Sequence, residues 1–86
     1  MPKISYFFGI VIKMFFDDHN PPQFHAEYAE YNAKIAIKNF ALLEGYLPSR
    51  AMALVIEWAS LHQSELLKNW ELMLKKQPLT KIEPLK

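Results

Sequence analysis

The chain lacks cysteine, has little glycine and carries almost no net charge. Its 86 residues include no Cys and two Gly, and 10 Lys and Arg residues are balanced by 9 Asp and Glu residues. Without cysteine it can form neither a disulfide framework nor a zinc site with thiolate ligands. Two isolated glycines, Gly9 and Gly45, cannot build a glycine-rich phosphate loop. The balanced charge is not that of a strongly electrostatic nucleic-acid binder, so nucleic acid is a weak candidate partner.

Long apolar runs are absent as well. The first 13 residues are largely apolar, but Gly9 and Lys13 interrupt them and no small-residue cleavage site follows. No run approaches the roughly 18 apolar residues of a membrane span. We therefore expect a cytoplasmic protein of bacterial type that does not contact a membrane. No spacing of His, Asp and Glu indicates a metal site, and no motif indicates a cofactor.

What the chain does have is apolar and aromatic content. Hydrophobic residues make up 51% of the sequence and aromatic residues 14%, which excludes a disordered chain. A single domain of this length buries only about 60–65% of its unfolded surface. The chain must therefore pack its thin core very well or share apolar surface with a partner protein or with another copy of itself.

Residues 3–38 have the composition of β-strands. Two runs rich in β-branched and aromatic residues flank Gly9, and two alternating segments follow the turn-forming residues 17–22. We expect four antiparallel strands in a meander, with Ala29, Glu30 and Tyr31 as the link between the last two. Strict alternation places Phe7, Val11 and Phe15 on one sheet face and Tyr6, Phe8, Ile10, Ile12 and Met14 on the other. This pattern predicts an apolar, aromatic face that the rest of the chain leaves uncovered.

Residues 48–76 have the composition of a helix. The 28 residues from Ser49 to Lys76 contain no Gly or Pro, and as one straight helix they would be about 42 Å long. Such a helix would extend beyond its own sheet. A break near residues 62–64, with Ser64 as N-cap, is one solution and the one we favour; a single long or kinked helix is the alternative. Residues 77–86 form an extended tail, and the whole chain, residues 1–86, is predicted to be one α+β domain with the helical half on one sheet face.

The first candidate site is the loop that contains His19, Asn20, Pro21 and Pro22, with His25 just after it. An imidazole titrates near neutrality, so paired histidines suit acid–base chemistry, and the two prolines hold the loop rigid. The plain alternative is a tight turn whose histidines bind nearby backbone. Two histidines without a third ligand are a weak metal signal.

The second candidate set lies on the predicted helix and comprises Arg50, Glu57, His62, Glu65 and Asn69. On an unbroken helix the last three continue the apolar stripe, whereas Arg50 and Glu57 also fit a solvated face. His25 points away from the face that carries Phe24 and Ala26, so only His19 is free to join His62 and Glu65. These three residues are the candidate catalytic set. The candidate binding residues are His19, Asn20, His25, Arg50, Glu57 and Asn69.

Several segments together resemble a known family. They are residues 18–25 (Asp-His-Asn-Pro-Pro-Gln-Phe-His), 44–48 (Glu-Gly-Tyr-Leu-Pro), 57–62 (Glu-Trp-Ala-Ser-Leu-His), Asn69 with Trp70, and the two chain ends at residues 1–4 and 81–85. The combination resembles the small bacterial family catalogued as domain of unknown function 4160. The resemblance implies a stand-alone protein often encoded beside another small protein, as in a toxin–antitoxin cassette. It brings no catalytic residues, and the usual pattern has a third His where this chain has Gln23.

The leading functional expectation is a protein-interaction component of such a two-gene cassette. It would bind through the loop at His19–Pro22 and the aromatic sheet face. The alternative is a small toxin-like RNase that uses His19 with His62 or Glu65 as acid and base, assisted by a lysine-rich C-terminal end. A third possibility is a structural dimer that exchanges its tail between subunits.

Overall fold

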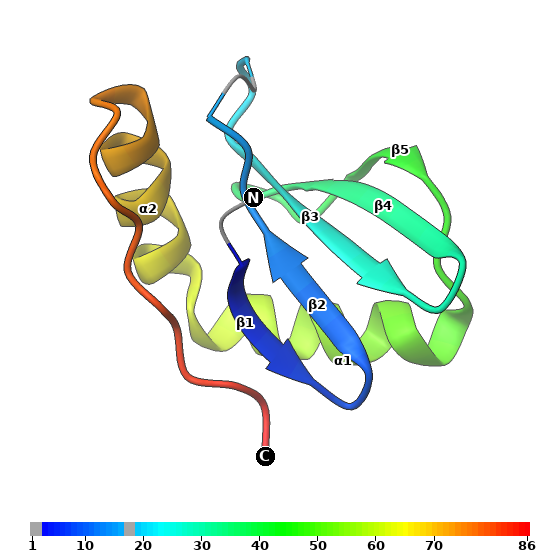
Figure 1. Cartoon of the computed structure of the whole chain (residues 1–86). Coiled ribbons are helices and arrows are strands. Elements are labelled where there is room, and N and C mark those ends of the chain that lie inside the picture. Colours follow the sequence, from blue (N-terminus) through cyan, green and yellow to red (C-terminus); the bar gives the residue numbers. More distant parts are fainter. Residues whose placement is uncertain (1–2, 17–18) are drawn as a thin grey trace.

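Five antiparallel strands form one meander sheet in the computed structural model, which describes residues 3–16 and 19–86 (Figure 1). Each strand pairs with the next along the chain, in the order β1-β2-β3-β4-β5. The strands are β1 (Lys3–Phe7), β2 (Ile10–Lys13), β3 (Gln23–Tyr28), β4 (Tyr31–Ala36) and β5 (Leu42–Gly45). The prediction of an antiparallel meander is confirmed, but the predicted number of four strands is wrong. The fifth strand follows the turn after β4 and ends at Gly45, in a segment for which we predicted no strand.

The β1–β2 turn reverses the face that we assigned to β1. Phe8 and Gly9 have positive φ angles of 49° and 80°, and Phe7 is paired directly with Ile10. A two-residue turn of this kind places its flanking residues on the same face of the hairpin. Phe7 is therefore buried beside Ile10 and Ile12, whereas Tyr6 and Phe8 are more than half exposed. The prediction that Phe7 and Ile10 lie on different faces of the sheet is wrong, because the alternation of side chains does not continue through the turn.

The helical half consists of two separate helices, α1 (Ser49–Leu61) and α2 (Gln63–Leu74), rather than one long or kinked helix. His62 separates them with the non-helical angles φ −125° and ψ 25°. A break at this point was the favoured alternative, but His62 and not Ser64 occupies the N-cap position of α2. Gln63 holds the start of α2 against the end of β4, since its Nε2 donates to the carbonyl oxygens of Ile37 at 2.8 Å and Lys38 at 3.1 Å. No helix in the described ranges is long and apolar enough to cross a membrane.

The core lies between one face of the sheet and the two helices. Trp58 of α1 is fully buried, and its ring lies 5.3 Å from that of Phe7 and 6.0 Å from that of Phe24. α2 contributes Leu66, Trp70 and Met73, all buried. Figure 1 looks onto the other sheet face, with α1 passing behind the strands.

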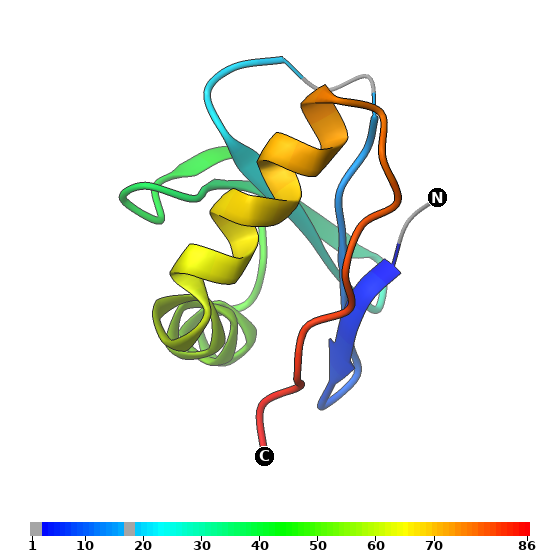
Figure 2. The same ribbon diagram turned by 90° about the vertical axis from the view of Figure 1, so that its left-hand side faces the viewer.

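The tail, residues 77–86, is extended and docks on its own chain. It runs from the end of α2 alongside β1, as the views in Figures 1 and 2 both show. The Ile82 amide donates to the Ile4 carbonyl at 2.8 Å, and the Ile82 side chain is buried. The Trp58 indole N–H donates to the Glu83 carbonyl at 2.8 Å. The tail therefore covers part of the β1 edge of the sheet.

Candidate functional site on the open sheet face

The sheet face opposite the helices carries side chains from four strands in register. Lys13, His25, Lys34 and Glu44 are cross-strand neighbours in one row, from β2 to β5. Val11, Glu27 and Asn32 form the adjoining row. His25 points away from buried Phe24 and Ala26, as the alternation of β3 predicts. We call the surface formed by these two rows, together with Tyr6 and Phe15, the open face.

The open face is a mixture of apolar and charged groups and is not the uniformly apolar surface that we expected. Lys13 Nζ lies 3.1 Å from Glu27 Oε1, and Lys34 Nζ lies 3.5 Å from Glu44 Oε1. The Phe15 and His25 rings meet edge to face, with centroids 4.3 Å apart. The aromatic content of the face was overestimated because Phe7 belongs to the core.

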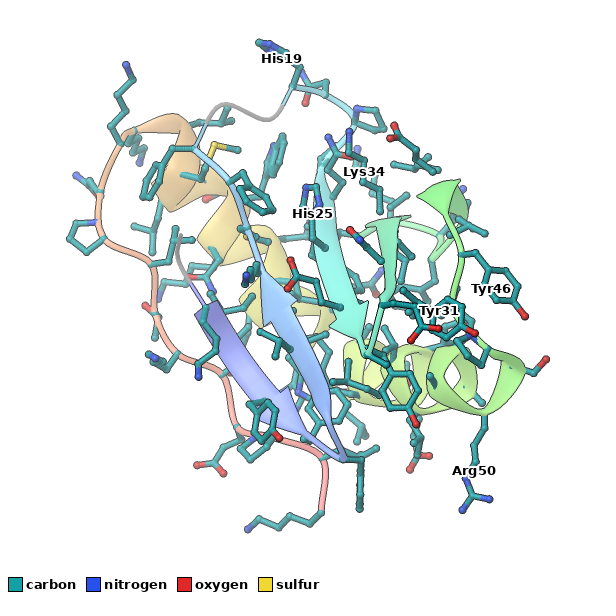
Figure 3. All side chains as sticks on the ribbon, turned by 45° about the vertical axis from the view of Figure 1, so that its right-hand side comes forward. His19, His25, Tyr31, Lys34, Tyr46 and Arg50 are labelled. Carbon is teal, nitrogen blue, oxygen red and sulfur yellow. The ribbon has the colours of Figure 1, made fainter. Side chains whose placement is uncertain are left out.

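Two adjoining hollows mark the β4–β5 side of the open face. The first, about 350 Å³, is lined by His25, Asn32, Ala33, Lys34, Glu44 and Gly45. The second, about 410 Å³, is lined by His19, Asn20, Pro21, Gln23, Lys34, Leu43 and Glu44. Lys34 and Glu44 belong to both hollows. The loop that we singled out from the sequence therefore shares a surface with the strands, and Figure 3 shows His19, His25 and Lys34 along it.

The loop itself is held by the side chain of Gln23. The Gln23 Nε2 donates to the His19 carbonyl at 2.9 Å, and Gln23 is 6% exposed. The Asn20–Pro21 peptide bond is cis, and both residues are exposed. His19 thus projects from a loop whose backbone is tied to β3.

His62 and Glu65 lie elsewhere and bind each other. His62 Nδ1 is 2.6 Å from Glu65 Oε1, and the His62 ring lies 5.6 Å from the Trp58 ring. Figures 1 and 2 both show the β2–β3 loop well apart from the α1–α2 junction. In the described parts of the chain, no hollow, hydrogen bond or ring contact includes both His19 and His62. The structure therefore does not bring the three candidate catalytic residues together.

The remaining predicted binding residues also lie off the open face. Asn69 is 1% exposed and binds the tail backbone: its Nδ2 donates to the Thr80 carbonyl and its Oδ1 accepts from the Thr80 amide, both at 2.8 Å. Glu57 is exposed on α1, and Arg50 is exposed in the first turn of that helix. In residues 3–16 and 19–86, no three His, Asp or Glu side chains come close enough to hold a metal ion.

Sequence reasoning missed Asn32, Lys34, Leu43 and Glu44. Lys34 could have been predicted, because it alternates with buried Ala33 and Ile35 and so must lie on the same sheet face as His25. Glu44 and Leu43 could not have been predicted as site residues, because their strand was not predicted.

A comparison with protein-family models finds a match. The family described as "Domain of unknown function (DUF4160)" matches residues 9–71. The chain belongs to this family. The matched range of DUF4160 covers the loop, β2 to β5, α1 and most of α2, and it leaves out β1 and the tail. A search of the curated proteins and a search of the solved structures found no match.

Proposed function

We propose that this DUF4160 protein is a protein-interaction module that binds its partner on the open face and along β5. The observation that carries the proposal is that Lys34 and Glu44 line both hollows. Through them the rigid loop, the centre of the sheet and the β5 edge become one continuous surface. A surface built from four strands and one loop is large enough to hold a protein segment.

The two edges of the sheet differ in a way that supports this proposal. The tail covers part of the β1 edge through the bond from Ile82 to Ile4. All four residues of β5 are exposed, with Leu42 at 48% and Leu43 at 42%. Exposed edge strands pair readily with strands of other proteins, and most proteins protect them. β5 is short and its register with β4 shifts between Lys34 and Ile35, but it exposes two leucines beside a polar hollow, and a partner can add a strand at such an edge.

The charges on the open face favour a polar partner surface. In the Lys34–Glu44 pair Glu44 is exposed and Lys34 is half-buried, and such surface pairs contribute only about 0–1 kcal/mol. Lys34 and Glu44 can therefore leave each other and bind groups on a partner protein at little cost in free energy. The resemblance stated above implies a second small protein encoded alongside, so we infer that the partner is the product of an adjacent gene in a toxin–antitoxin-like cassette.

The RNase alternative receives less support from the geometry. A general acid and a general base must both reach the substrate, within hydrogen-bond distance or through one water. The loop that carries His19 is apart from His62 and Glu65, and the latter two bind each other. Cleavage by these residues would require a large rearrangement. We therefore give precedence to the interaction module.

The test is size-exclusion chromatography with light scattering, on the protein alone and mixed with the adjacent gene product. We expect a stable complex with the mass of the two chains. Leu43→Lys should weaken it at least about tenfold, since central apolar contacts contribute most to an interface. Lys68→Glu, on the exposed surface of α2, is the matched control and should leave the complex intact. A protein that stays monomeric in the mixture, or two variants that bind equally well, would contradict the proposal.

A further inference from the structure

A separate cavity lies on the helix side of the sheet, between the β1–β2 turn and the start of α1. Its volume is about 280 Å³, and its lining is mainly apolar. The lining residues are Phe8, Ile10, Tyr28, Pro48, Arg50, Ala51 and Leu54. Figure 1 places this end of the sheet opposite the β2–β3 loop. The cavity is thus distinct from the hollows of the open face.

Arg50 is the one charged residue in this lining. No acidic residue stands in the first turn of α1. Within the described ranges, the Arg50 guanidinium has no ion-pair partner. Figure 3 shows its side chain reaching from the start of α1 into solvent. The mouth of an apolar cavity therefore carries an unpaired positive charge on a long and flexible side chain.

We propose that this cavity binds a short aliphatic monocarboxylate. The alkyl chain would lie against Phe8, Ile10 and Leu54, where its burial is favourable. The carboxylate would stay at the mouth, where the Arg50 side chain, once turned toward the cavity, can donate two parallel hydrogen bonds to it. The volume is near the lower limit of ligand pockets, roughly 300 Å³, which favours a short chain over a long lipid. This inference does not depend on the proposed interaction function.

Octanoate is the probe, and amide chemical shifts of the isotopically labelled protein are the readout. Titration should give saturable shifts in residues 8–10, 28 and 50–54. Octanamide, which has the same alkyl chain without the charge, should bind at least about twofold more weakly. Arg50→Ala should lower the affinity for octanoate about two- to fivefold, the range expected for an exposed ion pair. Arg50→Lys should retain only part of the affinity, because it keeps the charge but cannot make the bidentate hydrogen bonds.

Two controls make the result decisive. Lys68→Ala removes a distant exposed cation on α2 and should not change octanoate binding. Leu54→Trp, at a half-buried position, should fill the cavity and abolish the shifts while the folded spectrum is preserved. Equal binding of octanoate and octanamide would overturn the recognition of the charge. The absence of saturable shifts below the micelle concentration, or shifts confined to other residues, would overturn the site.

Discussion

Gly45 and Gly9 share a backbone conformation but not their surroundings. Their φ angles are 85° and 80°, a region that residues with a Cβ atom rarely adopt. A Cβ atom on Gly45 would lie 2.1 Å from the Asn32 carbonyl oxygen and 3.0 Å from the Ala33 Cα. A Cβ atom on Gly9 would meet Tyr28 Cε1 at 3.5 Å, an ordinary contact. Position 45 therefore requires glycine both for its backbone angle and for the close approach of β5 to β4. Position 9 requires glycine for its backbone angle alone.

We expect Gly45→Ala to be much more damaging than Gly9→Ala. The backbone cost of a left-handed residue is about 1–2 kcal/mol, and Gly9→Ala should lower the free energy of unfolding by that amount. Gly45→Ala adds a clash with backbone atoms and should cost more than about 3 kcal/mol, or detach β5 from the sheet. Urea unfolding of both variants measures the difference. Equal losses would show that β5 moves away from β4 without cost.

At the scale of elements, the α1–α2 junction decides how the helical half covers the sheet. His62 leaves the helical conformation, and Gln63 fastens the new helix to the Ile37 and Lys38 carbonyls. A straight continuation of α1 would carry Leu66 and Trp70 away from the sheet, whereas both are buried in the core. The break thus removes helical hydrogen bonds at the junction, and in return the apolar side chains of α2 are buried against the sheet.

Gln63→Ala should loosen this junction. It removes two hydrogen bonds to backbone carbonyls, so the free energy of unfolding should fall by about 1–2 kcal/mol. Amide exchange should accelerate in the first turn of α2 more than in α1. Gln77→Ala, at an exposed position in the tail, is the matched control and should change stability by less than about 0.5 kcal/mol. A Gln63→Ala protein as stable as the control would show that core packing alone sets the break.

Local patterns were sufficient for most elements. The composition of residues 3–38 gave four antiparallel strands, and the length of the helical segment favoured a break near residues 62–64. They failed at the β1–β2 turn and at the sheet edge. Phe7 was assigned to the wrong face because the alternation rule cannot show that Phe8 and Gly9 form a two-residue turn. The strand β5 was missed because an exposed edge strand has no buried face and therefore no alternation.

The candidate site was predictable only in part. His19 and His25 are local features and lie on or beside the open face. Placing His62 with His19 required the relative position of the loop and the helices, which sequence spacing does not contain. Asn69 shows the same limit: its position in the apolar stripe indicated a buried polar group, but its partner, Thr80, is a tail residue.

For the molecule as a whole, the decisive feature is the unequal treatment of the two sheet edges. One edge is partly covered by the chain's own tail and the other is left open at β5. Because a free edge invites pairing, we expect the docked tail to favour partners that bind on the β5 side and on the open face.

Asn69 is the residue that should control the docking of the tail on the β1 edge. Asn69 is buried and binds both the amide and the carbonyl of Thr80. Thr80 lies two residues before Ile82, whose amide donates to the Ile4 carbonyl. Asn69→Ala leaves these backbone groups without partners and should lower the free energy of unfolding by about 2–3 kcal/mol. The Thr80 and Ile82 amides should exchange with solvent much faster, and concentrated samples should begin to self-associate through the freed β1 edge.

Exposed Asn32 provides the matched control, since Asn32→Ala should leave tail exchange and tail docking unchanged. Hydrogen exchange measured residue by residue separates local release of the tail from global unfolding. If Asn69→Ala lowers stability but the Ile82 amide stays as protected as the rest of the core, the tail is held by the buried Ile82 side chain and the Trp58–Glu83 bond. In that case Asn69 stabilises the fold without governing the edge.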